Sequence, residues 1–168
     1  MAYRFSIADT PELRRLPWEK MEAEGLTRAI LWNRLQPTLL DWLELVSPST
    51  TLMGLAFDDE KGGELAGSLW VVPSGQCGTV HFVIFNNWRA DNVRLGREAV
   101  RWIFETWTLE GLLAAFPAGY RHLWTFMEAL GFTPWPERLP KACNMPTAGN
   151  PKRCKDMALA LLRRDEVR

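Results

Sequence analysis

A short basic turn that leads into a helix is the feature of this sequence that most directly suggests binding chemistry. The stretch RADNVRLGREAVRW, residues 89–102, follows the apolar run HFVIF, residues 81–85. The first amide groups of a helix have no partners within it and lie at the positive end of its dipole, so an anion can bind there. Arg89, Arg94 and Arg97 surround Gly96 with positive charge. The turn predicts a phosphate site; a solvated helix start with surface arginines is the alternative.

Two positions have side chains suited to proton transfer. His81 lies on the apolar run before the turn, and an imidazole with a pKa of about 6.5 is a suitable general base at neutral pH. It shares a strand face with Val83 and Phe85, so a half-buried histidine held by one hydrogen bond is the alternative. Tyr120, followed by His122, opens a later helix. Tyr120 could donate a proton to a leaving group, or both residues could pack at the helix start.

The cysteines and the late basic segment give weaker signals. Cys77, Cys143 and Cys154 form no CxxC pair and no Cys/His zinc spacing, so we expect reduced thiols and no metal site. Residues 138–155 contain five basic residues and no acidic residue. We expect a long loop there, which either closes over an acidic acceptor or partner or is simply solvated.

The composition limits the class of protein. With 168 residues we expect a single domain over 1–168, and 20 basic residues against 20 acidic ones disfavour a nucleic-acid partner. No run approaches the ~18 apolar residues of a membrane span, and the N-terminus has no apolar leader region. We expect a cytoplasmic protein with no membrane partner, and leave its state, monomer or homodimer, open.

The hydrophobic periodicity predicts the elements that must position these residues. An alternating pattern indicates strands at 3–8, 51–57, 64–72, 79–85, 109–116 and 155–164. Helical spacing indicates a helix capped by Thr10, a helical region 27–46 divided by Pro37, and helices at 93–107 and 118–132. This order predicts a mixed, mostly antiparallel sheet flanked by helices, an α/β or α+β domain.

Two local patterns and this element order resemble the GNAT (N-acetyltransferase) superfamily. HFVIF is similar to the family's fourth strand, NNWRADNVRLGREAV to the turn and helix that bind the pyrophosphate of acyl-coenzyme A, and YRHLWTFMEALGF to a later helix. Among members, the chain looks most like GNAT-like proteins encoded by phages and prophages. The resemblance implies a single GNAT-like domain that uses acetyl-CoA as co-substrate and an amine as acceptor.

The resemblance also implies roles for particular residues. The pyrophosphate would lie over Arg94, Leu95, Gly96 and Arg97, with Arg89 nearby. Backbone groups of Val83–Phe85 would hold the pantetheine arm, with His81 as base and Tyr120 as acid.

The chain departs from the family pattern at four positions, of which Tyr120 stands where the family has an asparagine. Val93 stands where the family turn usually has Gln or Arg, Glu98 replaces a small residue, and Met127 occupies the place of a tyrosine that often protonates the leaving thiolate. We expect Glu98 to pair with Arg94 four residues earlier. Two functions follow: an acyl-CoA-dependent N-acyltransferase, or a catalytically inactive GNAT-like binding or assembly protein of a phage.

Overall fold

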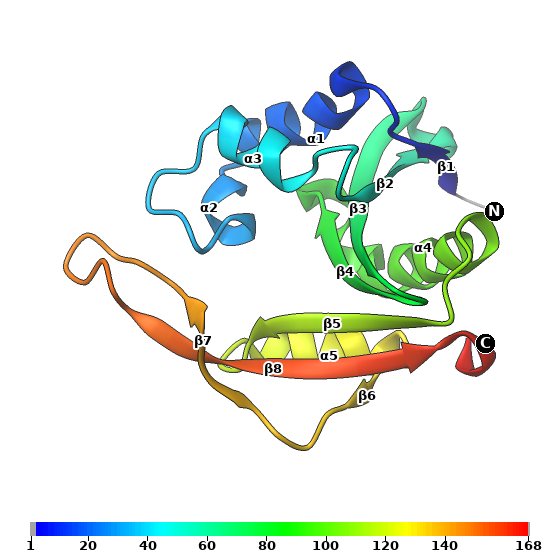
Figure 1. Cartoon of the computed structure of the whole chain (residues 1–168). Helices are drawn as coiled ribbons and strands as arrows, with labels where there is room; N and C mark the ends of the chain where they lie inside the picture. The colour runs from blue at the N-terminus through cyan, green and yellow to red at the C-terminus, as the bar shows by residue number, and fades with distance from the viewer. Residues whose placement is uncertain (1–2, 168) are drawn as a thin grey trace.

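One twisted sheet runs through the computed structural model, which describes residues 3–167 (Figure 1). The strands are β1 (Tyr3–Ile7), β2 (Leu52–Asp58), β3 (Glu64–Ser74), β4 (Cys77–Ile84), β5 (Gly111–Pro117), β6 (Thr133–Pro134), β7 (Leu139–Asn144) and β8 (Cys154–Arg163). The helices are α1 (Pro11–Ala23), α2 (Thr27–Ile30), α3 (Leu39–Leu45), α4 (Asn92–Thr106) and α5 (Arg121–Ala129). Short 3₁₀ turns cover Asp59–Lys61, Asn86–Asp91 and Arg164–Glu166.

The sheet order is β1-β2-β3-β4-β5-β8-β6, with β7 also paired to β8. Neighbours are antiparallel except β4 and β5, which run parallel. Their pairing covers only Cys77–Thr79 against Gly111–Leu113, after which the two strands part. The mixed, mostly antiparallel sheet confirms the fold class expected from the sequence.

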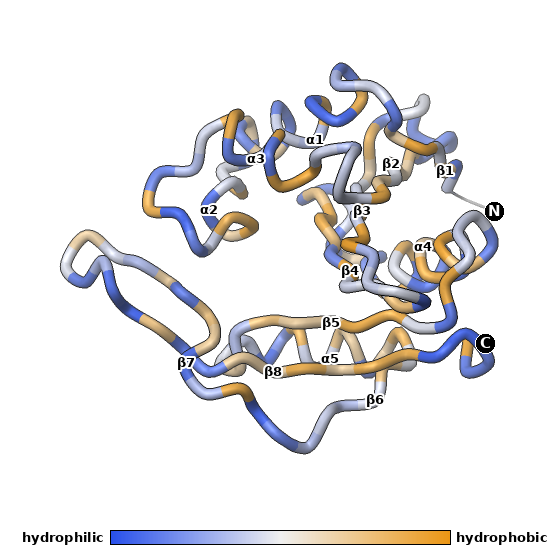
Figure 2. Tube along the Cα trace, in the orientation of Figure 1, coloured by the Kyte–Doolittle hydropathy of each residue, from blue (hydrophilic) through white to orange (hydrophobic). Residues whose placement is uncertain are grey.

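Helices cover both faces of this sheet. Trp18 of α1 and Trp42 of α3 share a core with Met53, Trp70 and Val83 on one face. On the other face, α4 and α5 form a second core with β3, β4, β5 and β8, to which they contribute the buried residues Ala99, Val100, Ile103, Phe104, Met127 and Leu130. Figure 2 shows hydrophobic residues concentrated in the strands and on the sides of the helices that meet them. Residues on β4 therefore alternate between two differently covered faces.

Local sequence signals set the N-terminal helices. The Thr10 side chain accepts a hydrogen bond from the Leu13 amide at the start of α1, and Pro11 occupies the first turn. Pro37 lies between α2 and α3, and Thr38 with Asp41 forms a capping box at the start of α3. The predicted division of 27–46 is confirmed, although the two helices are shorter than that range.

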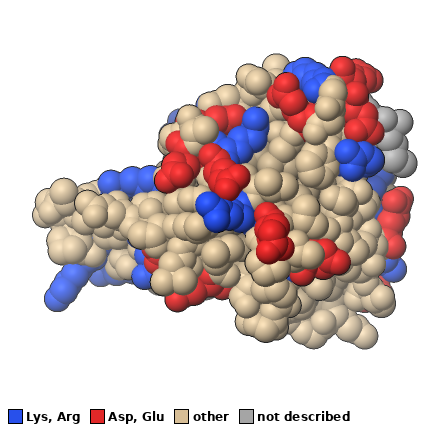
Figure 3. Space-filling view, turned by 90° about the horizontal axis from the view of Figure 1, so that it is seen from above, with Lys and Arg blue, Asp and Glu red and all other residues tan. Residues whose placement is uncertain are grey.

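The expectation of a long structureless loop at 138–155 is wrong. Residues Leu139–Asn144 form β7, which pairs antiparallel with β8 and places the Cys143 side chain in a buried position. The two strands and their connection form a hairpin that projects from the body (Figures 1 and 3). The prolines hid this strand, because they interrupt the alternating pattern that marks one.

None of the described helices is long and apolar enough to cross a membrane.

Candidate functional site

A cavity of about 410 Å³ lies where β4 and β5 part. Its walls come from α2 and the segment after it, β3, β4, β5 and the start of α5. Side chains in these walls include those of Ile30, Trp32, Trp70, His81, Phe82 and Tyr120. Because a parallel pair of strands stops after three residue pairs, the sheet itself opens and makes room for a ligand.

His81 lies in the wall of this cavity, on the face of β4 that carries Trp70 opposite it. Its ring stacks on the Trp70 indole with a centroid distance of 4.9 Å and an interplanar angle of 9°. No described residue forms a hydrogen bond with the imidazole. Burial disfavours the charged ring and lowers the pKa of His81 from 6.5 to about 4. The imidazole is therefore neutral at neutral pH, with a free nitrogen lone pair.

Tyr120 and His122 line the same cavity from the start of α5. Their rings stack with a centroid distance of 5.5 Å. Met127, at the position of the family tyrosine, is buried about two helical turns beyond Tyr120 and also lines the cavity. The structure thus brings His81 and Tyr120, the two predicted proton carriers, into one cavity.

A second hollow of about 380 Å³ adjoins this cavity and reaches the start of α4. It shares Phe82, His122, Leu123 and Phe126 with the first cavity and reaches Arg89 and Asn92 at its other end. Asn92 is the first residue of α4, which continues directly from the 3₁₀ turn Asn86–Asp91, so the groove ends at this helix start beside the exposed Arg89 guanidinium group. We refer to the two hollows together as the β4–α5 groove.

The backbone of β4 contributes polar groups to the gap. The Phe85 amide donates to the Ala66 carbonyl oxygen at 3.1 Å, so odd-numbered residues of β4 bond to β3. The alternation of an antiparallel ladder leaves the amides and carbonyls of Phe82 and Ile84 facing the gap. The side chains of Val83 and Phe85 are buried toward α1 and α3. The free backbone groups are thus displaced by one residue from the predicted Val83 and Phe85.

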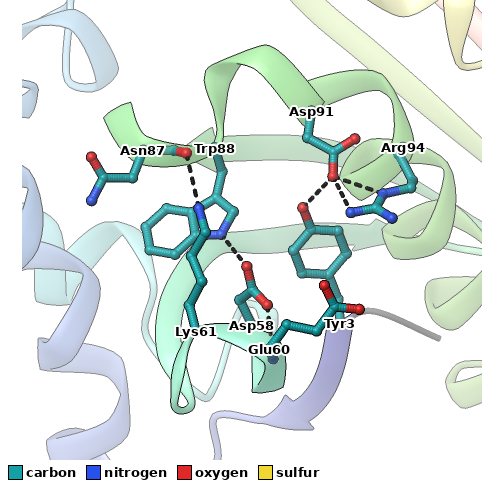
Figure 4. A network of polar contacts seen from close by, with 8 residues as sticks. All are labelled: Tyr3, Asp58, Glu60, Lys61, Asn87, Trp88, Asp91 and Arg94. Carbon is teal, nitrogen blue, oxygen red and sulfur yellow. Dashed lines mark hydrogen bonds and ion pairs between the residues drawn. The ribbon is translucent and has the colours of Figure 1, made fainter.

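Arg94 lies away from the groove, against the N-terminal strand (Figure 4). Its Nε donates to the Asp91 carboxylate at 2.7 Å, and its guanidinium group stacks over the Tyr3 ring. The Tyr3 hydroxyl donates to the same carboxylate at 2.6 Å. Burial raises the pKa of Asp91, but the hydrogen bonds from Tyr3 and Arg94 outweigh it and lower the pKa below its ordinary value. Glu98 was expected as the partner of Arg94; Asp91, three residues earlier, takes that place.

Trp88, which follows the groove strand, is an anchor of the turn rather than a groove-lining residue. It is 2% exposed, and its Nε1 donates to the Asp58 carboxylate at 2.7 Å. Lys61 lies over the indole at 4.7 Å and donates to the Asn87 carbonyl oxygen (Figure 4). The turn at Asn86–Asp91 is therefore fixed from behind by the β2–β3 connection, and Arg89 is left on its open side.

The remaining predicted phosphate residues lie in the first two turns of α4. Leu95 and Gly96 are buried, and a Cβ on Gly96 would lie 2.8 Å from the Leu130 side chain. Gly96 therefore allows α4 to approach α5 closely. Arg97 is exposed, and its Nε donates to the Ala129 carbonyl oxygen at 2.9 Å. One carboxylate oxygen of the neighbouring Glu98 is buried and has no hydrogen-bond partner among the described residues. Of the basic residues predicted to bind phosphate, the structure places Arg89 in the groove.

Sequence reasoning missed the aromatic residues that shape the cavity. Trp32, Trp70 and Phe126 line it, and each looked like an ordinary core residue because apolar periodicity does not distinguish a core from a pocket wall. One signal was present: an antiparallel pairing of 64–72 with 79–85 places Trp70 directly across from His81.

Comparison of the whole chain with solved structures identifies its architecture. Spermidine N-acetyltransferase from Vibrio cholerae, in complex with CoA and spermine, superposes with a TM-score of 0.74 over 99% of this chain and 98% of that one, at 11% identity. The fold is that of the GNAT acetyltransferases. Ribosomal-protein-S5-alanine acetyltransferase from Vibrio fischeri shares it, with a TM-score of 0.60, 13% identity, and coverage of 100% of this chain and 96% of that one. No protein-family model and no curated protein sequence matches this chain.

Small ligands usually bind in concave, largely apolar pockets with a few polar groups, and the cavity where β4 and β5 part has that character. Fold alone does not fix function, so the site residues must carry the argument. Within residues 3–167 no group of three or more His, Cys, Asp or Glu side chains could hold a metal ion.

Proposed function

We propose that this protein is an acyl-CoA-dependent N-acyltransferase that transfers an acetyl group to an amine by direct attack. The observation that carries the proposal is the β4–α5 groove, which joins a basic helix start to a cavity holding His81 and Tyr120. The similar fold of a V. cholerae N-acetyltransferase that holds CoA supports it.

Acetyl-CoA would bind along the groove with its pyrophosphate at the start of α4. The Arg89 side chain would supply donors and positive charge there, together with the positive end of the α4 dipole. The pantetheine arm would pass along the Phe82 and Phe126 rings, which contact each other edge to face with their centroids 6.0 Å apart, and its amides would bond the Phe82 and Ile84 backbone. Arg94 and Arg97 would contribute long-range charge, since their side chains already have partners in Asp91 and Ala129.

The acetyl group would then lie in the gap between β4 and β5. A backbone amide of β4 that faces the gap can donate to the thioester carbonyl oxygen as negative charge develops on it. The amine would enter from the opposite side, next to Ala29, Ile30, Trp32, Trp70 and His81, which we call the acceptor side. His81 would accept the amine proton, directly or through water, and Tyr120 would protonate the departing thiolate.

Calorimetric titration with acetyl-CoA is the first test. We expect a dissociation constant in the micromolar range, weakened about tenfold or more by Arg89→Glu because that change reverses a charge beside the pyrophosphate. Arg15→Glu, an exposed arginine on α1 paired with Glu19, is the matched control and should leave binding unchanged. Absence of heat up to millimolar acetyl-CoA, with the protein folded, would refute the proposal.

A catalytically inactive GNAT-like binding or assembly module is the second candidate. Two observations favour it: Met127, which cannot protonate a thiolate, stands where the family has a tyrosine, and Glu98 holds a buried carboxylate oxygen without a partner near the proposed pyrophosphate turn. Release of free thiol in the presence of amines separates the two, because only an enzyme produces it.

A further inference from the structure

The walls of the cavity are almost free of formal charge. Among the described residues that line it, none is Asp, Glu, Lys or Arg. Its titratable side chains are those of His81, Tyr120 and His122, and burial keeps His81 neutral at neutral pH. An ammonium group moved into this cavity would lose its hydration without meeting a carboxylate, which costs several kcal/mol. The cavity therefore disfavours a charged amine.

The rim of the cavity adds positive charge. Arg28 is exposed beside Ala29, and its Nη2 donates to the Pro146 carbonyl oxygen of the β7–β8 hairpin at 3.0 Å. Arg121 is exposed between two lining residues of α5. Like-charge repulsion from guanidinium groups next to the lining residues acts against a polycation such as spermine.

The acceptor side is aromatic. Trp32 and Trp70 line it, and Trp70 is 3% exposed. The Nε1 of Trp70 has no hydrogen-bond partner among the described residues. Indole N–H groups usually find an acceptor when they are buried. Flat apolar walls suit an aromatic ring.

We propose that the amine acceptor is an arylamine, a primary amine attached directly to an aromatic ring and uncharged at neutral pH. This inference rests on the proposed N-acyltransferase function. The amine nitrogen attacks the thioester carbonyl carbon, the N–C bond forms, and the C–S bond breaks. The nitrogen loses one proton and the departing thiolate gains one, so the products are an N-aryl acetamide and free CoA thiol.

A neutral arylamine does not require His81 to remove a proton before the nitrogen attacks. An alkylammonium ion must lose a proton before its nitrogen can attack, and a base with a pKa of about 4 removes that proton poorly. An arylamine arrives with its lone pair free. Its proton is lost only after the N–C bond forms, when the nitrogen has become far more acidic.

A matched pair of amines tests the inference. The substrates 4-methoxyaniline and 4-methoxybenzylamine differ by one methylene, yet at neutral pH the first is neutral and the second is an ammonium ion. With acetyl-CoA in excess and thiol release as the readout, we expect kcat/KM to be at least tenfold higher for 4-methoxyaniline than for 4-methoxybenzylamine or spermine. Equal values, or a preference for either cation, would overturn the inference.

The outcome separates the arylamine inference from the proposed function. If acetyl-CoA binds in the calorimeter but 4-methoxyaniline is not acetylated, the arylamine inference is overturned while acyl-CoA use stands. If acetyl-CoA does not bind and no amine releases thiol, both are refuted.

A pair of variants at the rim tests the electrostatic reasoning directly. Ala29 is exposed and lines the cavity, so it tolerates a polar side chain. Ala29→Asp supplies the missing carboxylate and should raise the ratio of kcat/KM for 4-methoxybenzylamine over 4-methoxyaniline about tenfold. Ala29→Asn, which has the same shape without the charge, is the reference against which this tenfold change is measured. An unchanged ratio in a folded Ala29→Asp protein would contradict the inference.

Discussion

Replacement of His81 by phenylalanine should make the stability of this protein less sensitive to acid. Phenylalanine keeps an aromatic ring on Trp70, where the two rings now stack at 4.9 Å, but it cannot bind a proton. In the wild type, the pKa of His81 falls from 6.5 in the unfolded chain to about 4 in the folded one because burial disfavours the imidazolium. Between these values the unfolded chain binds more protons, so stability rises with pH.

The sign and the size follow from these two values. The contribution of neutral His81 to the free energy of unfolding is complete above 6.5, the pKa of this residue in the unfolded chain. It is lost as the pH falls from 6.5 toward 4. Since one pKa unit corresponds to about 1.4 kcal/mol, the wild type should lose about 2 kcal/mol between pH 7 and pH 5 through this group. The His81→Phe variant should not show this loss of about 2 kcal/mol, because phenylalanine binds no proton.

Urea unfolding followed by tryptophan fluorescence between pH 7 and pH 5 measures the difference. Carboxylates with lowered pKa, such as those of Asp41 and Asp91, also make the protein less stable in acid, but they are present in both proteins and cancel. Parallel curves for wild type and His81→Phe, within about 0.5 kcal/mol, would show that the imidazole is solvated and would refute the reasoning.

Three further substitutions test the supports of the groove. Arg14→Met removes a buried guanidinium group that donates to the carbonyl oxygens of Ala8, Val46 and Thr51. Urea unfolding should show a free energy of unfolding lower by about 3–5 kcal/mol, and a decrease below about 1 kcal/mol would contradict this role. Gly67→Ala places a Cβ 2.7 Å from the Val83 carbonyl oxygen, and thermal unfolding should show a loss of about 1–3 kcal/mol, with an unchanged melting temperature as the contrary result. Tyr3→Phe removes the hydroxyl that donates to Asp91, so the pKa of Asp91 should rise toward its ordinary value in a carbon-13 NMR titration, and a pKa that stays put would mean that Arg94 alone sets it.

The periodicity of the sequence was enough to predict the sheet and most of its helices. Apolar alternation marked the central strands, and Thr10 and Pro37 marked helix ends. These features can be predicted from local sequence because each strand or helix buries one face, and that face gives the element its apolar periodicity. The strand at Leu139–Asn144 was missed because its pairing with β8, and not its own pattern, decides its conformation.

The directions of side chains at the turn could not be predicted. Arg94 was expected to face a phosphate, but its position depends on Tyr3, 91 residues earlier, and on the Asp91 carboxylate that Tyr3 also binds. Gly96 was interpreted as a phosphate-turn glycine, whereas close contact with Leu130 of α5 requires it. Both outcomes depend on packing between elements distant in sequence, for which one chain carries no local signal.

The early end of the β4–β5 pairing also gives β4 two kinds of backbone amide. Those of His81, Val83 and Phe85 face β3 and should exchange their hydrogens with solvent slowly, while those of Phe82 and Ile84 face the gap and should exchange fast. A strand inside a sheet would thus behave as an edge strand along one side. A ligand lying in the gap would act as its missing neighbour, and an alternating pattern of protection along five residues would become uniform once it bound.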